Sequence, residues 1–427
     1  MRLRLLAFVL LAACADRQPP AELDDAGPVS DGQSAPPTTP IVTVERITGE
    51  HRAIPGVMFG GWGPHLGHLL RVGDATYWVD DLCAPATGGD CDVNVNRRVG
   101  VFRRDTTGWT RLGVMALPGV QQNTASLAVG AHLYSYGIAS GAQRIVECDF
   151  SLASSSGACS TIPIPIGAFA NYVGAAVVPG GGRLVWWTNV VDGGGGSFSY
   201  LVNYGGGWNG PRTGPIGGYN DCGYAHVAFR GASAELFCQV VSGLAPNWSF
   251  ATLVGSTSTT LASPVAWTNG LAPPAGDSVM STNDLYVDPA GAAHLLARTS
   301  KGAAVYYHAP SGSAAYGPPA LVLPATFRAR WVAADTTLAL ARDVNRKRLV
   351  ISTAARADLA AGAFAPSTWS ETEVPLPTGF GDIVAIYPVS PAYQDGPIRD
   401  VELAVVGTGD EHVALYVRWS LPAPQPQ

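Results

Sequence analysis

A four-strand unit that recurs about every 50 residues is the feature that most limits how this chain can fold. Each copy consists of an apolar strand, a turn often containing Gly or Asp, and a second and third apolar strand. A step such as Gly-Trp then leads into a fourth strand. The clearest copies run through residues 284–323 and 173–208. Turns between the first two strands are expected near Gly73, Gly130, Gly181, Gly231, Ala290, Asn345 and Gln394.

Repeated antiparallel units of this length are typical of the blades of a β-propeller, where sheets stack around an axis because one blade cannot bury both of its faces alone. The turns favour seven four-stranded blades. Six blades is the alternative if the weak unit 331–377 is divided differently, and a pair of β-sandwiches is the main alternative fold. The last unit supplies three strands, so a strand at residues 41–47 is expected to complete it and close the ring. With 51 glycines and no long helical pattern, the chain is predicted to be all-β.

The N-terminus predicts an exported chain with a lipid anchor. Arg2 and Arg4 precede an apolar run from Leu5 to Ala13, which is shorter than the roughly 20 residues that span a bilayer. The stretch Leu-Ala-Ala before Cys14 resembles the lipobox of bacterial lipoproteins, and an ordinary signal peptide is the alternative. The resemblance implies cleavage before Cys14, a diacylglycerol on its sulfur, and attachment to the membrane of the cell envelope. Ala15 follows that cysteine, which by the sorting rule implies the outer membrane.

The predicted organisation has four parts. Residues 1–13 form the signal peptide, 14–40 a lipidated disordered linker, 41–421 the propeller and 422–427 a flexible tail. The linker is rich in proline and acidic residues and has no aromatic residue, so it cannot bury enough apolar surface to fold. Its Asp-Ala-Gly-Pro stretch resembles the linkers of myxobacterial lipoproteins. The net charge of −6 argues against a nucleic-acid partner, and a monomer is expected.

Six of the seven cysteines follow Cys14 and fall into three local couples. An even number in an exported chain suggests disulfides, although six cysteines allow about 15 connectivities. Because each couple brackets a predicted turn, the expected pairs are Cys83–Cys91, Cys148–Cys159 and Cys222–Cys238. A zinc site is disfavoured, because no Cys-x-x-Cys or suitably spaced histidine accompanies any couple.

Polar residues are expected at the starts of the first strands of successive units. They are His68, Asn123, Asn171, Asp221, Asp284, Asp335 and Asp382. Because innermost strands line the central channel of a propeller, these side chains would converge on one face and bind a sugar or a peptide. Their oxygens could also hold Ca²⁺, although no resident cofactor is expected and the metal is unknown. The alternative is that Asn and Asp stand there because they favour turns.

The rhythm of strands over residues 41–421 resembles the sialidase-like or BNR-type propellers of exported bacterial proteins. The stretch from Val287 to Leu296 and the step Ser-Thr-Trp-Ser at 367–370 carry the resemblance. The Asp-box of that family is absent in its usual form, and the arginine triad and the Tyr/Glu pair of sialidases find no counterparts. The resemblance therefore implies the fold, while the activity has to be argued from the site.

The sequence favours a binding function over a catalytic one. It contains neither Gly-x-Ser-x-Gly nor a phosphate-binding Gly-x-x-x-x-Gly-Lys loop, and no catalytic residue can be assigned. The leading interpretation is a binding or assembly module for a glycan or protein. The alternative is a glycosidase or lyase that uses Asp284, Asp335 and Asp382, since a glycosidase needs two carboxyl groups about 5–10 Å apart.

Overall fold

The computed structural model divides into two units, residues 1–39 and 40–427. All described residues belong to the second unit: 40–47, 66–83, 97–117, 119–120, 124–139, 144–164, 169–191, 195–216, 219–231, 233–242, 245–254, 267–269, 271–277, 279–313, 315–360, 362, 364–408 and 413–420. The predictions for Cys14, Cys91, Asn123 and the tail 422–427 lie outside them.

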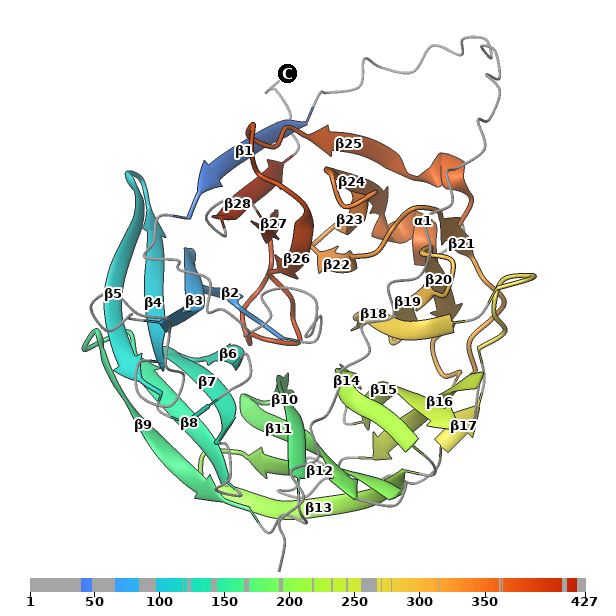
Figure 1. The fold of residues 1–427 in the computed structure, drawn as a ribbon. Coiled ribbons are helices and arrows are strands. Elements are labelled where there is room, and N and C mark those ends of the chain that lie inside the picture. Colours follow the sequence, from blue (N-terminus) through green and yellow to red (C-terminus); the bar gives the residue numbers. More distant parts are fainter. Residues whose placement is uncertain are drawn as a thin grey trace, which may run out of the picture. The chain divides into compact units, whose positions relative to one another are not determined.

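The described strands pair into seven four-stranded antiparallel sheets that surround a common centre (Figure 1). The innermost strands are β2 (Leu69–Val72), β6 (Ala125–Val129), β10 (Phe169–Val178), β14 (Tyr219–Arg230), β18 (Val279–Val287), β22 (Ala329–Ala333) and β26 (Ile383–Pro388). Next to them lie β3 (Ala75–Cys83), β7 (His132–Ala139), β11 (Gly182–Val191), β15 (Ser233–Ser242), β19 (Ala293–Thr299), β23 (Thr337–Val344) and β27 (Val401–Gly407). The expectation of an all-β propeller is confirmed.

The two remaining positions of each sheet lie further from the centre. The third strands are β4 (Arg97–Asp105), β8 (Arg144–Ser151), β12 (Gly195–Asn203), β16 (Ala245–Val254), β20 (Ala304–Ala309), β24 (Arg348–Ala355) and β28 (Val413–Ser420). The outer strands are β5 (Gly108–Ala116), β9 (Ser156–Pro163), β13 (Trp208–Ile216), β17 (Trp267–Asn269), β21 (Leu321–Leu323), β25 (Ser370–Val374) and β1 (Ile41–Arg46).

The ring closes with strands from both ends of the chain, as the sequence predicts. β1 pairs with β28 in an antiparallel register that runs from Ile41 opposite Ser420 to Arg46 opposite Leu415. A buried ion pair joins the first and last sheets, because Nη1 of Arg71 on β2 lies 2.7 Å from Oε1 of Glu402 on β27. This closure leaves the β28 edge covered instead of open to another chain.

The core lies between neighbouring sheets. In one buried cluster, Trp186 and Tyr200 of the β10–β13 sheet pack with Val227 of β14 in the next sheet. In another, Leu340 of β23 packs with Tyr306 of β20. Alternate residues of the strands supply these contacts, which is why the apolar pattern repeats with each sheet. Helices are short: α1 spans Arg356–Ala360 and a 3₁₀ turn, η1, spans Pro366–Thr368. No helix in the described ranges is long and apolar enough to span a membrane.

One predicted turn has to be reassigned. The turn at Asn345 joins β23 to β24, whereas the first two strands of that sheet meet at residues 334–336. Asn345 and Arg346 have φ angles of +52° and +61°, a conformation that Asn tolerates better than most residues. The sequence 334–336, Ala-Asp-Thr, contains no glycine and therefore gives a weaker turn signal.

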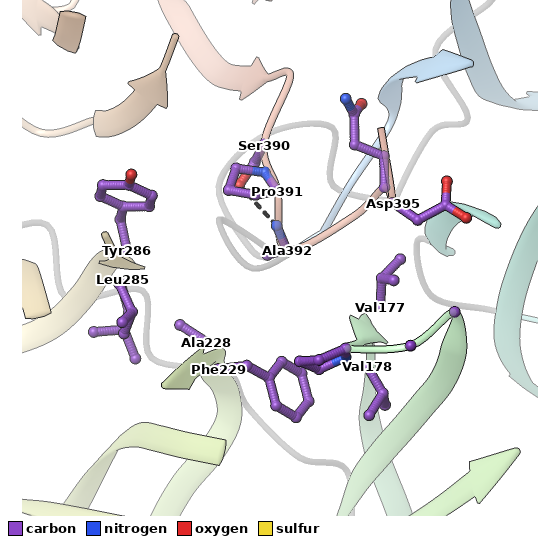
Figure 2. A pocket seen from close by; sticks show the side chains of 15 residues that line it. Val177, Val178, Ala228, Phe229, Leu285, Tyr286, Ser390, Pro391, Ala392 and Asp395 are labelled. Carbon is purple, nitrogen blue, oxygen red and sulfur yellow. Dashed lines mark hydrogen bonds between the residues drawn. The ribbon is translucent and has the colours of Figure 1, made fainter. Parts of the chain in front are cut away.

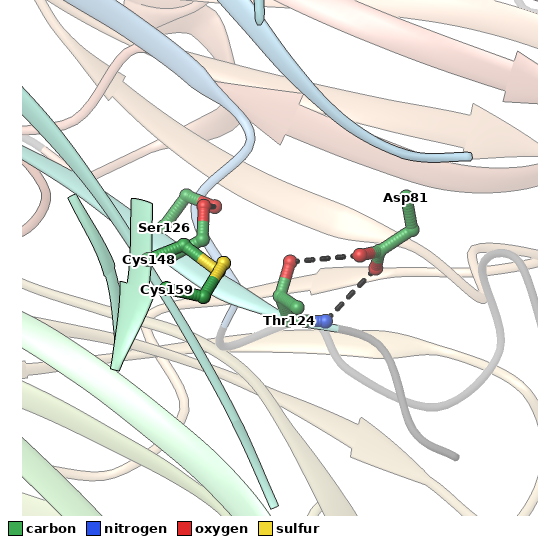
Figure 3. Close-up of a disulfide and its surroundings, with 6 residues drawn as sticks. Asp81, Thr124, Ser126, Cys148 and Cys159 are labelled. Carbon is green, nitrogen blue, oxygen red and sulfur yellow. Dashed lines mark hydrogen bonds between the residues drawn. A yellow bond between two sulfur atoms is a disulfide. The ribbon is translucent and has the colours of Figure 1, made fainter. Parts of the chain in front are cut away.

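The cysteine prediction is confirmed for one pair. Cys148 on β8 stands directly opposite Cys159 on β9, and their sulfurs form a disulfide (Figure 3). Cys222 lies in β14 and Cys238 in the adjacent β15, while Cys83 ends β3. The side chains of these three are outside the described part of the chain, so Cys83–Cys91 and Cys222–Cys238 stay predictions.

Candidate functional site

The polar residues predicted at the starts of the inner strands lie in different settings. His68 directly precedes β2 and Asp382 directly precedes β26, whereas Asp284 lies inside β18. Asn171 and Asp221 belong to β10 and β14, and their side chains are outside the described residues. The placement of Asp335 at the start of an inner strand is wrong, because this exposed residue follows β22.

The error at Asp335 has a specific cause. The segment 337–344 is largely apolar and reads as an inner strand, but it forms β23, the second strand of its sheet. The true inner strand, β22, contains Arg330, and a charged residue is not expected against a propeller channel. That guanidinium is 2% exposed and is neutralised by Asp284, which makes the position tolerable.

Asp284 is the centre of a buried polar cluster that connects three sheets. Its Oδ2 accepts hydrogen bonds from Nε of Arg330 at 3.0 Å and from the amide of Trp331 at 2.8 Å. Its Oδ1 lies 3.3 Å from Nδ1 of His226 on β14. Burial opposes ionisation, but Arg330 and His226 outweigh it and hold the pKa of Asp284 below its usual range. With both oxygens engaged, this carboxylate joins inner strands and is poorly placed to bind a ligand.

His68 and Asp382 are also engaged by the protein. His68 is 4% exposed, and its Nδ1 lies 2.8 Å from the carbonyl oxygen of Val79. Its ring packs against Trp78 and Tyr387, at centroid distances of 5.6 Å and 4.7 Å. The half-exposed carboxylate of Asp382 pairs with Lys347 in the β23–β24 turn. Within the described ranges, no group of three or more His, Cys, Asp or Glu residues is arranged to hold a metal ion.

A different feature stands at the centre of the ring, where the inner strands end. The connection between β26 and β27, residues 389–400 and here called the central segment, hydrogen-bonds to three other sheets. The carbonyl oxygen of Tyr393 accepts the amide of Ala128 at 2.7 Å, and that of Ala392 accepts the amide of Val177 at 2.8 Å. The side-chain oxygen of Gln394 accepts the amide of Arg71 at 2.8 Å.

The sequence of the central segment explains why it leaves the sheet. Pro388, Pro391 and Pro397 lack amide donors, so this stretch cannot continue a regular ladder. A turn from Ser390 to Tyr393 reverses the chain, with the amide of Tyr393 donating to the carbonyl oxygen of Ser390 at 3.0 Å. The other connections between first and second strands are far shorter. The unusual length of this connection is the sequence feature that could have pointed to the central segment, whereas the sequence analysis identified only a turn near Gln394.

A cavity of about 270 Å³ lies between the central segment and the ends of three inner strands. Figure 2 shows Val177 and Val178 on β10 and Ala228 and Phe229 on β14, facing the segment that carries Ser390 and Asp395. The lining residues are Val177, Val178, Pro179, Gly180, Gly181, Ala228, Phe229, Leu285, Tyr286, Val287, Ser390, Pro391, Ala392, Gln394 and Asp395. The walls are therefore apolar, and the side-chain hydrogen-bonding groups are concentrated on the central segment.

Three residues of the central segment that line this cavity carry polar side chains. Gln394 is 3% exposed; its oxygen is fixed by the Arg71 amide, and its Nε2 has no hydrogen-bond partner among the described residues. Asp395 is exposed, and its Oδ2 accepts the amide of Gly130 at 2.9 Å, which leaves Oδ1 available. Ser390 accepts the amide of Ala392 at 3.3 Å and keeps its hydroxyl proton to donate.

The charge of the cavity is set by one residue. Among the described residues of the lining, Asp395 is the only ionisable group apart from the phenol of Tyr286, and none of them is Lys, Arg or His. The arrangement can therefore bind a small polar molecule with an apolar face. The described part of its lining holds one carboxylate, whereas a glycosidase uses a pair.

Comparison with known proteins supports the fold and gives no family. No described protein family matches the sequence, and no curated protein matches it either. Solved structures do match: the polysaccharide lyase Uly1 is 10% identical with a TM-score of 0.54, over 89% of this chain and 99% of that one. A periplasmic gluconolactonase of Pseudomonas aeruginosa is 14% identical with a TM-score of 0.48, over 73% and 88%. A lectin from Aleuria aurantia in complex with Fucα1-6GlcNAc is 11% identical with a TM-score of 0.41, over 70% and 94%.

Proposed function

We propose that this chain is an exported lipoprotein whose seven-bladed propeller serves as a binding module for a glycan or protein partner. The observation that carries the proposal is the cavity of about 270 Å³ between the central segment and the ends of β10, β14 and β18. The apolar walls and few polar groups agree with the usual composition of ligand sites.

The anchor of this module is proposed from the sequence. A lipid on Cys14 would hold the chain at the cell envelope, and the sorting rule favours the outer membrane. The linker 14–40 would separate the lipid from the ring, so that a monomeric propeller could reach its partner. The acidic net charge of −6 continues to favour partners other than nucleic acid.

A carbohydrate-active enzyme is the second candidate, and the surroundings of its candidate carboxylates weigh against it. Asp284 is held by Arg330, Asp382 by Lys347, and Asp335 lies in an exposed turn after β22. Asp395 is the one carboxylate among the described residues that line the cavity. Acid–base cleavage of a glycosidic bond needs a second group across the substrate, and a binding role does not.

Two experiments test these proposals separately. Metabolic labelling with a tagged fatty acid should mark the wild-type chain and leave Cys14→Ser unlabelled and absent from membranes; label on both would contradict the anchor. For the propeller, full-length protein is applied to a glycan array and incubated with fluorescent polysaccharides. Binding of the protein to glycans on the array without shortened fluorescent polysaccharides supports a binding module. Release of shortened polysaccharides supports the enzyme. Parallel assays with Ca²⁺ and with EDTA report whether a cation takes part.

A further inference from the structure

We infer that Arg298 and Arg346, together with the largely buried Arg328, form a binding site for a doubly charged oxyanion of the phosphate type. These three residues, here called the arginine site, lie where the inner strands begin. The central cavity lies at the other ends of the inner strands, so this second site goes beyond the proposed function and does not depend on it.

The fold brings the three arginines together from two neighbouring sheets. Arg298 is the last residue but one of β19, Arg328 directly precedes β22, and Arg346 lies in the turn between β23 and β24. β19 and β23 run antiparallel to the inner strands β18 and β22, so the ends of β19 and β23 lie beside the beginnings of those inner strands. All three arginines therefore reach the same edge of the propeller.

The ring of Phe327 holds two of these side chains in place. Cζ of Arg298 lies 5.2 Å and Cζ of Arg346 lies 4.5 Å from the centre of that ring. The ring is itself confined by the turn after β19, since a Cβ built on Gly302 would lie 3.2 Å from two of its atoms. A guanidinium is attracted to the face of an aromatic ring. Both groups are therefore oriented before a ligand arrives, which lowers the entropic cost of binding.

The two arginines on Phe327 are accessible and have no counter-ion in the described part of the chain. Arg346 is exposed and Arg298 is half-buried, and no described carboxylate lies within ion-pair distance of either one. Nε of Arg298 is enclosed by the protein, so its Nη atoms are the ones that reach solvent. Lys347, the next residue in the turn, is different because it pairs with Asp382. The Nη atoms of both arginines can therefore donate to an external oxyanion.

Arg328 adds a third positive charge that water screens poorly. Its guanidinium donates to the carbonyl oxygens of Val384 at 3.0 Å and Phe327 at 3.3 Å. Burial, and then the charge of Arg298, lower the pKa of Arg328 to about 10, so it stays charged at neutral pH. Burial and the charge of Arg346 likewise lower the pKa of Arg298. The three groups are close enough to repel one another, and a bound anion would relieve that repulsion.

The charge of the arginine site favours a dianion. Asp343 is the carboxylate whose charge acts on both Arg298 and Arg328. It is fully buried, its Oδ1 accepts the amides of Phe327 at 2.7 Å and Arg328 at 2.6 Å, and burial raises its pKa. It offsets at most one of the three positive charges. A phosphate monoester carries about −1.5 to −2 charge at pH 7 and three acceptor oxygens, which matches the remaining excess and the donors of two guanidiniums.

The test measures affinity by titration calorimetry with full-length protein at low ionic strength. The soluble probes are inorganic phosphate and glucose 6-phosphate, with glucuronate as a singly charged carboxylate. Phosphatidylcholine vesicles with and without phosphatidic acid distinguish a lipid headgroup from a soluble phosphate. Arg298→Gln and Arg346→Gln each remove one charge and keep a polar side chain. Arg348→Gln is the matched control, since this exposed arginine begins β24 next to the same turn and pairs with Glu373 at 3.0 Å.

At least one phosphate probe should bind, and Arg298→Gln and Arg346→Gln should each weaken it about 10-fold or more, the usual effect of losing a hydrogen bond between charged groups. Arg348→Gln should change the affinity by less than about 2-fold. Binding to phosphatidic acid vesicles alone, with the same loss in the first two variants, supports the site and identifies a lipid headgroup as the source of the phosphate. Tighter binding of glucuronate, an equal loss in Arg348→Gln, or no binding of any phosphate probe would overturn the inference.

Discussion

Nε of Arg330 donates to Oδ2 of Asp284 at 3.0 Å, and this ion pair joins the inner strands β18 and β22 of two neighbouring sheets. The two side chains are 2% and 7% exposed. Nη2 of Arg330 also reaches the hydroxyl of Tyr393, at 3.4 Å, so the same guanidinium connects the ring wall to the central segment. The pair therefore positions the segment that carries the candidate site.

Replacing Asp284 with Asn should strongly destabilise the propeller. The amide keeps an oxygen that can accept the Trp331 amide, but the charge of Arg330 is left buried without a counter-ion. Breaking a buried pair in this way costs about 3–5 kcal/mol. Urea denaturation followed by tryptophan fluorescence would measure the change in the free energy of unfolding. The control is Asp335→Asn, which should change it by less than about 0.5 kcal/mol; equal losses in both variants would contradict the structural role of the pair.

The fold was predictable because its signals are local. Apolar strands separated by Gly-containing turns define most sheets, and the spare strand 41–47 together with a three-stranded last unit predicts the pairing of β1 with β28. The assignment of the inner strand failed in the sheet that contains β22, because the charge on this strand is neutralised by a residue of another sheet. Arg330 is acceptable in β22 only because Asp284 lies beside it, and the two are 46 residues apart in sequence.

The candidate site was much less predictable. Asn and Asp near strand starts suggested a ring of ligands, but the described members of that set bind protein groups or lie in turns. The residues that do line the cavity belong to a connection whose path depends on hydrogen bonds to β2, β6 and β10. Nothing in the local sequence of Ser390, Gln394 or Asp395 specifies those distant partners.

The stability of the propeller should fall as the pH drops from neutrality towards 4, and His308 should account for part of the loss. Burial and the neighbouring His294 lower the pKa of His308 to about 4, with Asp288 acting in the opposite direction. A histidine with a depressed folded pKa binds fewer protons when folded than when unfolded. The stabilisation of the folded state that depends on a neutral His308 is therefore complete above the unfolded pKa of about 6.5, and it is lost as the pH falls through that value towards 4.

The matched variant for this prediction is His308→Gln, which keeps a polar side chain and cannot titrate. Because His308 is partly exposed, solvent screening reduces the effect, and we expect the variant to lose about 1 kcal/mol less than the wild type between pH 7 and pH 5. Urea denaturation at a series of pH values would measure both profiles. Parallel profiles would show that His308 does not contribute to the acid sensitivity.

Removing the disulfide between β8 and β9 should destabilise the chain moderately. Cys148 and Cys159 are 11 residues apart, and closing such a loop stabilises by about 2–3 kcal/mol in the chain-entropy model. The double variant Cys148→Ala/Cys159→Ala should lose this amount in urea denaturation without a reducing agent. If Cys83–Cys91 and Cys222–Cys238 also pair, the double variant should lose further stability when dithiothreitol is added. Mass mapping of unreduced peptides would identify those pairs, and long-range pairing would contradict them.

Replacing Gly67 with Ala should displace the central segment. A Cβ built on Gly67 would lie 2.5 Å from the carbonyl oxygen of Ser126 and 2.6 Å from the ring of Tyr393. Neither neighbour can yield easily, since the oxygen belongs to the inner strand β6 and Tyr393 is 4% exposed. Overpacking of this kind costs about 1–3 kcal/mol, which urea denaturation would detect. Gly396→Ala in the central segment is the control, because its Cβ would meet nothing within 4 Å and should leave stability nearly unchanged. If Gly67→Ala also left the free energy of unfolding unchanged, the close packing of Tyr393 against the residue that precedes β2 would be contradicted.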